Sequence, residues 1–119
     1  MLNFTKLQVL GIDTDEGLAY CADDAEFYGE MLEEYVSEVG KRLDDLPSHF
    51  SSHDWKAYGI LAHSIKSSSR MIGAKALSEL ARELEMATRE GAEDTILSGH
   101  DRFLTEYRDL AERIRECIR

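Results

Sequence analysis

Apolar residues recur at helical spacing along most of the chain, and short polar or glycine-containing breaks separate these stretches. The spacing predicts a short helix over 13–21 and four long helices over 24–46, 53–72, 74–90 and 95–118. Each long stretch keeps its apolar residues on one face, so each helix has one side to bury. Because amphipathic helices with short connections pack as antiparallel neighbours, we predict an all-α, up-down-up-down four-helix bundle with a short extra N-terminal helix.

The residues between these stretches carry the chemistry of helix ends. Residues 1–12 precede the first start signal and are predicted to form a lead-in without a helix. Pro47 lacks the backbone donor that an inner helical turn requires, so it is expected to end the first long helix. Ser51 and Asp54 have the spacing of a capping box, which places the next helix start near His53. Two glycines then mark the ends of the following helices, Gly73 and Gly91.

The composition limits the classes of partner that the chain can have. It contains 119 residues, of which 43% are hydrophobic and 32% charged, and this balance suits one globular domain over residues 1–119. Its 24 acidic and 14 basic residues leave a net charge of −10. Nucleic acids and anionic membrane surfaces both favour positive charge, so neither is an expected partner. No stretch approaches the roughly 20 apolar residues that a membrane span requires, and a monomer is the default expectation.

The ends of the chain and its cysteines favour a cytoplasmic location. The first residues contain no basic segment followed by a long apolar run, so no signal peptide is predicted. Cys21 and Cys117 lack the spacing of metal ligands and are expected to be reduced core residues, while one disulfide between them stays an open alternative. The initiating Met1 and the compact ends favour a free-standing protein over an excised domain.

One histidine is predicted to lie on the solvent side of its helix. On a helical wheel at about 100° per residue, Leu61 lies on the apolar face of the second long helix, and His63 lies about 200° away from it. Lys56, Lys66 and Arg70 share the side of His63. A neutral imidazole is a nucleophile, and neighbouring cations stabilise a phosphoryl group on such a ring. From position alone, an ordinary solvated helix face is the more common explanation of the same pattern, because exposed His and Lys are frequent.

The other three histidines are weaker candidates for chemistry. His100 falls on the core side of the last predicted helix, which favours a hydrogen-bonded core residue. His49 and His53 lie four residues apart, a spacing that binds a metal only when both are helical, and Pro47 argues against a helical His49. The chain has neither the Glu-x-x-His pairs of metal-binding bundles nor a glycine-rich phosphate loop, so no metal, cofactor or nucleotide site is predicted.

The sequence around His63 resembles a known family. Residues 62–74 read Ala-His-Ser-Ile-Lys-Ser-Ser-Ser-Arg-Met-Ile-Gly-Ala, and they resemble the signature of the histidine-containing phosphotransfer (Hpt) domain, approximately Ala-His-x-Leu-Lys-Gly-x-Ser-x-x-x-Gly-Ala. The leucine-rich run that ends at Glu85 and the upstream pair Gly17-Leu18 also resemble the family. The resemblance covers nearly the whole chain and implies a helical bundle, in agreement with the apolar periodicity.

The resemblance also implies a function, that of a phosphorelay intermediate in two-component signal transduction. His63 is then expected to accept a phosphoryl group at Nε2 from an aspartyl phosphate of a response-regulator receiver domain and to pass it to another receiver domain. The chain would be a phosphoryl carrier without ATP-dependent kinase activity, and a hybrid sensor kinase is a further expected partner. Magnesium is expected in the receiver, and no cofactor is expected in this chain.

The residues that follow His63 receive roles from the same resemblance. Lys66 matches the family lysine that steadies the phosphoryl oxygens, and Ser67, Arg70 and Arg89 are further candidates for this role. Ser67 departs from the family pattern, which has glycine at this position. A residue four places after His63 lies one turn along the helix beside the imidazole. Serine is small, so we expect the approach of a receiver loop to be kept.

An apolar residue accompanies His63 on the wheel. Ile60 is predicted to be exposed beside the imidazole, although isoleucine is more often buried. We expect Ile60, Ser67, Arg70 and parts of the first two helices to form the contact with a partner. Apolar surface rimmed by charge is typical of such recognition sites.

Two alternatives to the carrier stay open. The first is a helical docking module that binds a receiver or kinase without being phosphorylated, and the presence of both His63 and Lys66 argues against it. The second is a metal or cofactor bundle, for which the ligand spacing is missing.

Overall fold

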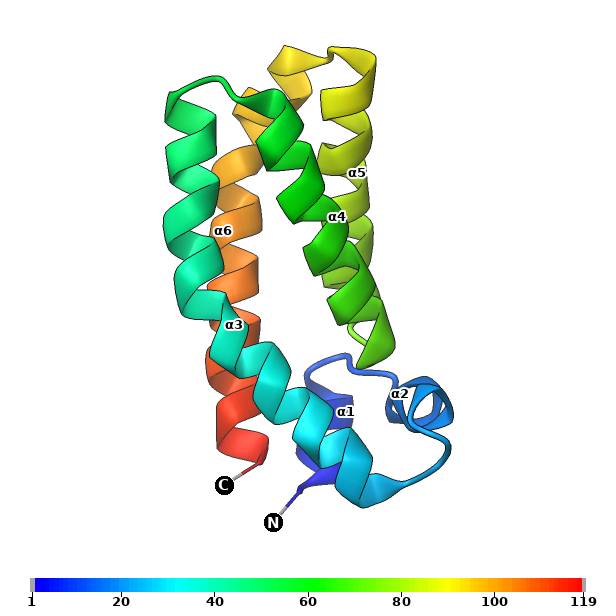
Figure 1. The fold of residues 1–119 in the computed structure, drawn as a ribbon. Coiled ribbons are helices and arrows are strands. Elements are labelled where there is room, and N and C mark those ends of the chain that lie inside the picture. Colours follow the sequence, from blue (N-terminus) through cyan, green and yellow to red (C-terminus); the bar gives the residue numbers. More distant parts are fainter. Residues whose placement is uncertain (1, 119) are drawn as a thin grey trace.

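The computed structural model describes residues 2–118, and the regular elements in that range are helices (Figure 1). The all-α prediction is therefore confirmed. Among the described residues, no helix is long and apolar enough to cross a membrane. The helices are α1 (Phe4–Val9), α2 (Thr14–Tyr20), α3 (Ala25–Ser51), α4 (Trp55–Met71), α5 (Lys75–Glu90) and α6 (Glu93–Cys117).

The four long helices enclose one core. Each packs against the next along the chain, and α6 returns to contact α3 (Figure 1). The short helices α1 and α2 cover the end of the molecule at which α3 begins and α6 ends. Burial of the apolar faces is the main stabilising contribution to such an arrangement. The largest fully buried side chains come from α1, the four long helices and the turn after α4: Leu7, Tyr28, Leu32, Leu46, Tyr58, Ile65, Ile72, Leu84, Ile96, Phe103, Tyr107 and Ile114.

Polar side chains begin four of the helices. Asn3, Asp13, Asp24 and Asp54 each accept a hydrogen bond from a backbone N–H in the first turn of α1, α2, α3 and α4, at 3.0–3.2 Å. These bonds satisfy donors that have no partner inside the helix. The start that was expected near His53 therefore lies at Asp54, and α2 covers most of the predicted segment 13–21.

The predicted break at Pro47 is wrong. Helix α3 continues through this proline to Ser51 instead of ending at residue 46. An inner proline costs a helix about 3 kcal/mol. The last turn of α3 carries Phe50, whose ring stacks on His100 with centroids 3.9 Å apart and meets the edge of Trp55 at 5.8 Å. We infer that this aromatic packing offsets the cost of the proline.

The predicted lead-in over residues 1–12 is also corrected, because it contains α1. Leu7 is the one buried residue of this six-residue helix, which is too short to display an apolar period. The backbone N–H of Asn3 donates to the carbonyl of Cys117 at 2.9 Å and attaches α1 to the end of α6. Both Cys21 and Cys117 are buried free thiols, so the disulfide that the sequence left open is not formed.

His100 lies on the core side of α6, as predicted. Its side chain is buried, its ring stacks on Phe50, and its Nδ1 shares a hydrogen bond of 2.8 Å with the Tyr58 hydroxyl. Burial lowers the pKa of the His100 imidazole, and the charge of Asp101 opposes this shift only in part. A neutral His100 is therefore part of the folded core at neutral pH.

Acidification is expected to destabilise the fold through His100. In the unfolded chain the imidazole has its ordinary pKa of about 6.5, whereas the folded pKa is lower, so the unfolded state binds the proton first. The contribution of His100 to the free energy of unfolding therefore has its full value above about pH 6.5. It decreases as the pH drops towards the folded pKa. Urea unfolding followed by circular dichroism between about pH 7.5 and 5 measures this loss.

Two glutamine variants isolate the effect of His100. His100→Gln removes the titration and keeps a hydrogen-bonding group near Tyr58, so its unfolding free energy should depend less on pH than that of the wild type. His53→Gln changes an exposed histidine and should keep the wild-type pH dependence. Equal pH slopes for His100→Gln and the wild type would show that His100 does not carry the effect.

Candidate functional site

The site lies where α4 and α5 approach closely. Gly59 of α4 faces Thr88 of α5, and a Cβ atom at position 59 would collide with the threonine side chain. The Ser78 hydroxyl donates to the backbone carbonyl of Lys66 at 2.9 Å and joins the two helices again further along. Small residues thus hold α5 close to the face of α4 that carries His63.

A buried carboxylate stands at the centre of the site. The Glu85 side chain is only 3% exposed, and it accepts from three basic groups. His63 Nδ1 lies 2.7 Å from Oε2, Lys66 Nζ lies 2.7 Å from Oε1, and Arg89 Nη2 lies 2.9 Å from Oε2. Burial alone would raise the pKa of Glu85, but the hydrogen bonds from Lys66 and His63 outweigh it and leave the pKa below its usual value. Glu85 is therefore ionised at neutral pH.

This carboxylate determines which nitrogen of His63 is reactive. An ionised carboxylate only accepts hydrogen bonds, so Nδ1 of His63 must carry the proton that lies between it and Glu85. In a neutral imidazole the lone pair is then on Nε2. The His63 side chain is 53% exposed, so this lone pair is accessible to a partner. The geometry thus presents an oriented nitrogen nucleophile at the surface.

A groove of about 500 Å³ lies beside His63, between α4 and α5. Ile60 lines it with 61% of its surface exposed, which confirms its predicted exposure next to His63. Trp55 adds a second apolar wall, and Lys56 and Arg89 add two cations. The groove therefore combines apolar surface with positive charge beside the nucleophile.

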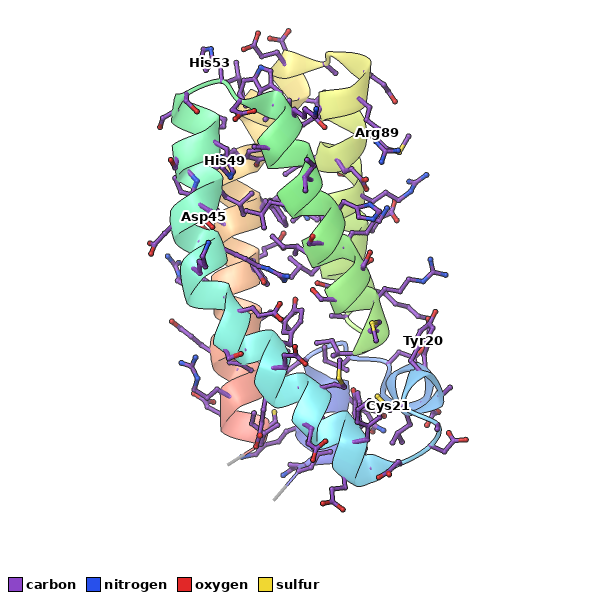
Figure 2. The ribbon with its side chains drawn as sticks, viewed as in Figure 1. Tyr20, Cys21, Asp45, His49, His53 and Arg89 are labelled. Carbon is purple, nitrogen blue, oxygen red and sulfur yellow. The ribbon has the colours of Figure 1, made fainter. Side chains whose placement is uncertain are left out.

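The other predicted site residues separate into two groups. Lys66 and Arg89 join His63 through Glu85, and Figure 2 shows Arg89 on α5 away from the core of the bundle. Ser67 and Arg70 instead line a second groove, which includes Lys66 but not His63. The structure therefore does not bring Ser67 and Arg70 together with Ile60 in one cavity.

Glu85 belongs to the leucine-rich run that resembles the family, but the sequence alone assigns it no role in the site. A signal for it existed, because Glu85 lies at the edge of the apolar stripe of α5, next to the buried Leu84. A carboxylate in such a place requires basic partners. Arg89, one helical turn later, provides one of them.

The pair His49 and His53 occupies different structural settings. His49 lies inside the last turns of α3, contrary to the expectation that Pro47 excludes it from a helix, and His53 lies in the connection to α4 (Figure 2). The ring of His53 stacks on Trp55 at 5.3 Å. Within residues 2–118, no three His, Cys, Asp or Glu side chains gather in an arrangement that could hold a metal ion.

Comparisons with known proteins identify the family of the chain. The family model of the Hpt domain matches residues 30–117. The phosphorelay intermediate protein rdeA of Dictyostelium discoideum is 33% identical over 73 residues, which make up 61% of this chain and 29% of that protein. The chain thus matches less than a third of the length of this relative, and no solved structure matches. Since the family model spans most of the chain and includes the α4–α5 pair with His63, Lys66 and Glu85, the chain belongs to the Hpt domain family.

Proposed function

We propose that the chain is a phosphorelay intermediate in which His63 accepts a phosphoryl group from the aspartyl phosphate of one response-regulator receiver domain and passes it to another. The observation that carries the proposal is the exposed Nε2 of His63, oriented by the hydrogen bond between Nδ1 and the buried Glu85. Membership of the Hpt family and the phosphorelay relative support a phosphotransfer role in two-component signalling.

The transfer step follows from the positions of these atoms. The Nε2 lone pair attacks phosphorus, an N–P bond forms, and the bond from phosphorus to the receiver's aspartate oxygen breaks and returns that aspartate as a carboxylate. Nδ1 keeps its proton, so the phosphorylated ring is a cation, which the ionised Glu85 stabilises at 2.7 Å. In the reverse direction the ring leaves as a neutral imidazole, and this allows His63 to pass the phosphoryl group on.

Two cations are placed to stabilise the phosphoryl group. Lys66 lies one turn after His63, and Arg89 approaches from α5, with both side chains held by Glu85. Positive groups fixed near the developing charge lower the barrier of the transfer. We assign the magnesium ion to the receiver and none to this chain. The chain is a carrier rather than a kinase, because His63 receives a phosphoryl group that the aspartyl phosphate has already activated.

The finer architecture and setting belong to the same proposal. We propose that the long helices run up-down-up-down as one domain over residues 1–119. The packing of each long helix on the next, and of α6 on α3, supports this arrangement. A hybrid sensor kinase is the proposed upstream partner. The monomeric state and the cytoplasmic location stay predictions from the composition.

Mass spectrometry after incubation with charged receivers tests the proposal. The chain is mixed with receiver domains of the source organism, each phosphorylated with acetyl phosphate, and the phosphorylated residue is located by fragmentation at neutral pH. We expect one acid-labile phosphoryl group on His63, because phosphoramidates hydrolyse in acid. His63→Gln should abolish the adduct, and His53→Gln, which changes an exposed histidine outside the site, should keep it.

The same experiment separates the carrier from the docking module. A receiver that binds without leaving a phosphoryl group on the chain would favour the docking module. A phosphoryl group on another residue, or none from any receiver, would contradict the role of His63.

A further inference from the structure

The charges of the chain divide unevenly between the α4–α5 pair and the remaining residues. Residues 55–90 contain six Lys or Arg and four Asp or Glu, a net charge of +2, whereas the rest of the chain contains eight basic and twenty acidic residues, a net charge of −12. One of the four acids is Glu85, which is buried and already paired with basic groups. The α4–α5 surface is therefore positive on a molecule that is otherwise strongly negative.

A second groove, of about 590 Å³, concentrates this positive charge. It lies between α4 and α5 beside α2, and its lining has four basic residues against two carboxylates: Lys66, Arg70, Lys75 and Arg82 against Glu16 and Glu79, with Ser67 and Ser78. Lys66 is shared between this groove and the cluster around Glu85. We call this surface the Arg70 groove.

The cations of the Arg70 groove differ in how far they are neutralised. Lys75 lies 3.0 Å from Asp13 and 2.8 Å from Glu16, so its charge is balanced. Arg82 lies 3.1 Å from Glu79, but both side chains are more than half exposed, and such surface pairs are weak. Among the described residues, no carboxylate lies within ion-pair distance of Arg70. The groove therefore has two guanidinium groups that are open to an external anion.

The position of Arg70 distinguishes it from the residues that act on the transferred group. Arg70 follows His63 by seven residues, which is two turns and about 10 Å along the same helix. It lines the Arg70 groove and not the groove beside His63. Arg70 and Arg82 are thus placed to contact an anion other than the phosphoryl group on Nε2, which Lys66 and Arg89 contact.

We propose that the Arg70 groove is a docking site for carboxylates on the surface of the receiver that exchanges phosphoryl groups with His63. This inference rests on the proposed function. Charge complementarity selects the occupant: an acidic protein surface is attracted to the α4–α5 face and repelled by the acidic remainder of the molecule, which orients the receiver before contact. Ser67, which stands where the family has glycine, adds a hydroxyl at the edge of the groove next to Lys66.

A pair of double variants with equal net charge tests the docking site. Arg70→Gln with Arg82→Gln neutralises the groove. Arg102→Gln with Arg108→Gln removes the same two charges from α6, where these exposed arginines pair with Glu106 and Asp109. Transfer from a phosphorylated receiver to His63 is measured over a range of receiver concentrations, at about 50 mM and about 300 mM salt. Each rate is normalised to the reaction of the same variant with phosphoramidate, a small donor that needs no docking surface.

The expected result is a difference in KM. The groove variant should raise KM for the receiver about five- to tenfold at low salt, the α6 variant less than twofold, and the difference should shrink at high salt. Equal KM values in the two variants, or a loss confined to the maximal rate, would overturn the docking site. The proposed function would still stand in that case, because the wild type transfers the phosphoryl group to His63. A wild-type chain that accepts no phosphoryl group from any receiver would overturn both.

Discussion

Glu85→Gln is expected to slow the transfer of a phosphoryl group to His63 by about a hundredfold. The amide has no negative charge, so the cationic ring of phosphorylated His63 loses its counter-charge at 2.7 Å. The amide N–H can also donate to Nδ1, which shifts the imidazole proton to Nε2 and removes the nucleophilic lone pair. Rapid-quench measurement of a single turnover with a phosphorylated receiver gives the rate directly.

A second measurement separates this positioning role from a structural one. Glu83→Gln makes the same chemical change at an exposed position of α5 and should alter the rate less than twofold. Nitrogen NMR of His63 should show the proton on Nδ1 in the wild type and in Glu83→Gln, and a mixture of tautomers in Glu85→Gln. Full-rate transfer by Glu85→Gln, or an unchanged tautomer, would show that Glu85 does not orient the imidazole.

The same site shows how far sequence reasoning reaches. His63 could be singled out because its wheel position depends only on the period of its own helix. Glu85 lies 22 residues later on another helix, and its contact with His63 depends on how α4 and α5 pack. Ser67 and Arg70 share a side of α4 with His63, but they line a different groove from the one beside His63, which the wheel does not predict. Single-helix periodicity predicts exposure, whereas the composition of a site depends on the partner helix.

The fold shows a similar division. Apolar periodicity predicts the long helices because each repeats its pattern over several turns. The local rule for Pro47 predicts a break, but the turn after it places Phe50 against Trp55 at the start of α4 and against His100, which lies far away in the sequence on α6. Helix α1 was missed because a six-residue segment with one buried side chain, Leu7, has no measurable period. In both segments, the turn after Pro47 and helix α1, tertiary contacts rather than local periodicity determine whether the residues are helical.

Gly73→Ala is expected to have the largest effect on stability, a loss of about 3 kcal/mol or more in the free energy of unfolding. Gly73 has a φ of 87°, in the region that side-chain-bearing residues rarely adopt, and a Cβ atom there would collide with the backbone carbonyl of Asp13. The carbonyl oxygen is not a flexible side chain that can turn aside. The backbone N–H of Asp13 donates to the Gly73 carbonyl at 2.9 Å, and the Asp13 side chain caps α2, so moving either residue also weakens the start of α2.

Gly40→Ala provides the matched control, because the same substitution should have the opposite sign there. Gly40 lies inside α3, and a Cβ atom at this position would meet nothing within 4 Å. Alanine at an open helical position stabilises by about 0.5–1 kcal/mol, because the unfolded chain loses conformational freedom. Urea unfolding of both variants measures the two free energies. If Gly73→Ala stays within about 1 kcal/mol of the wild type, then the turn between α4 and α5 relaxes without strain and does not depend on its contact with Asp13.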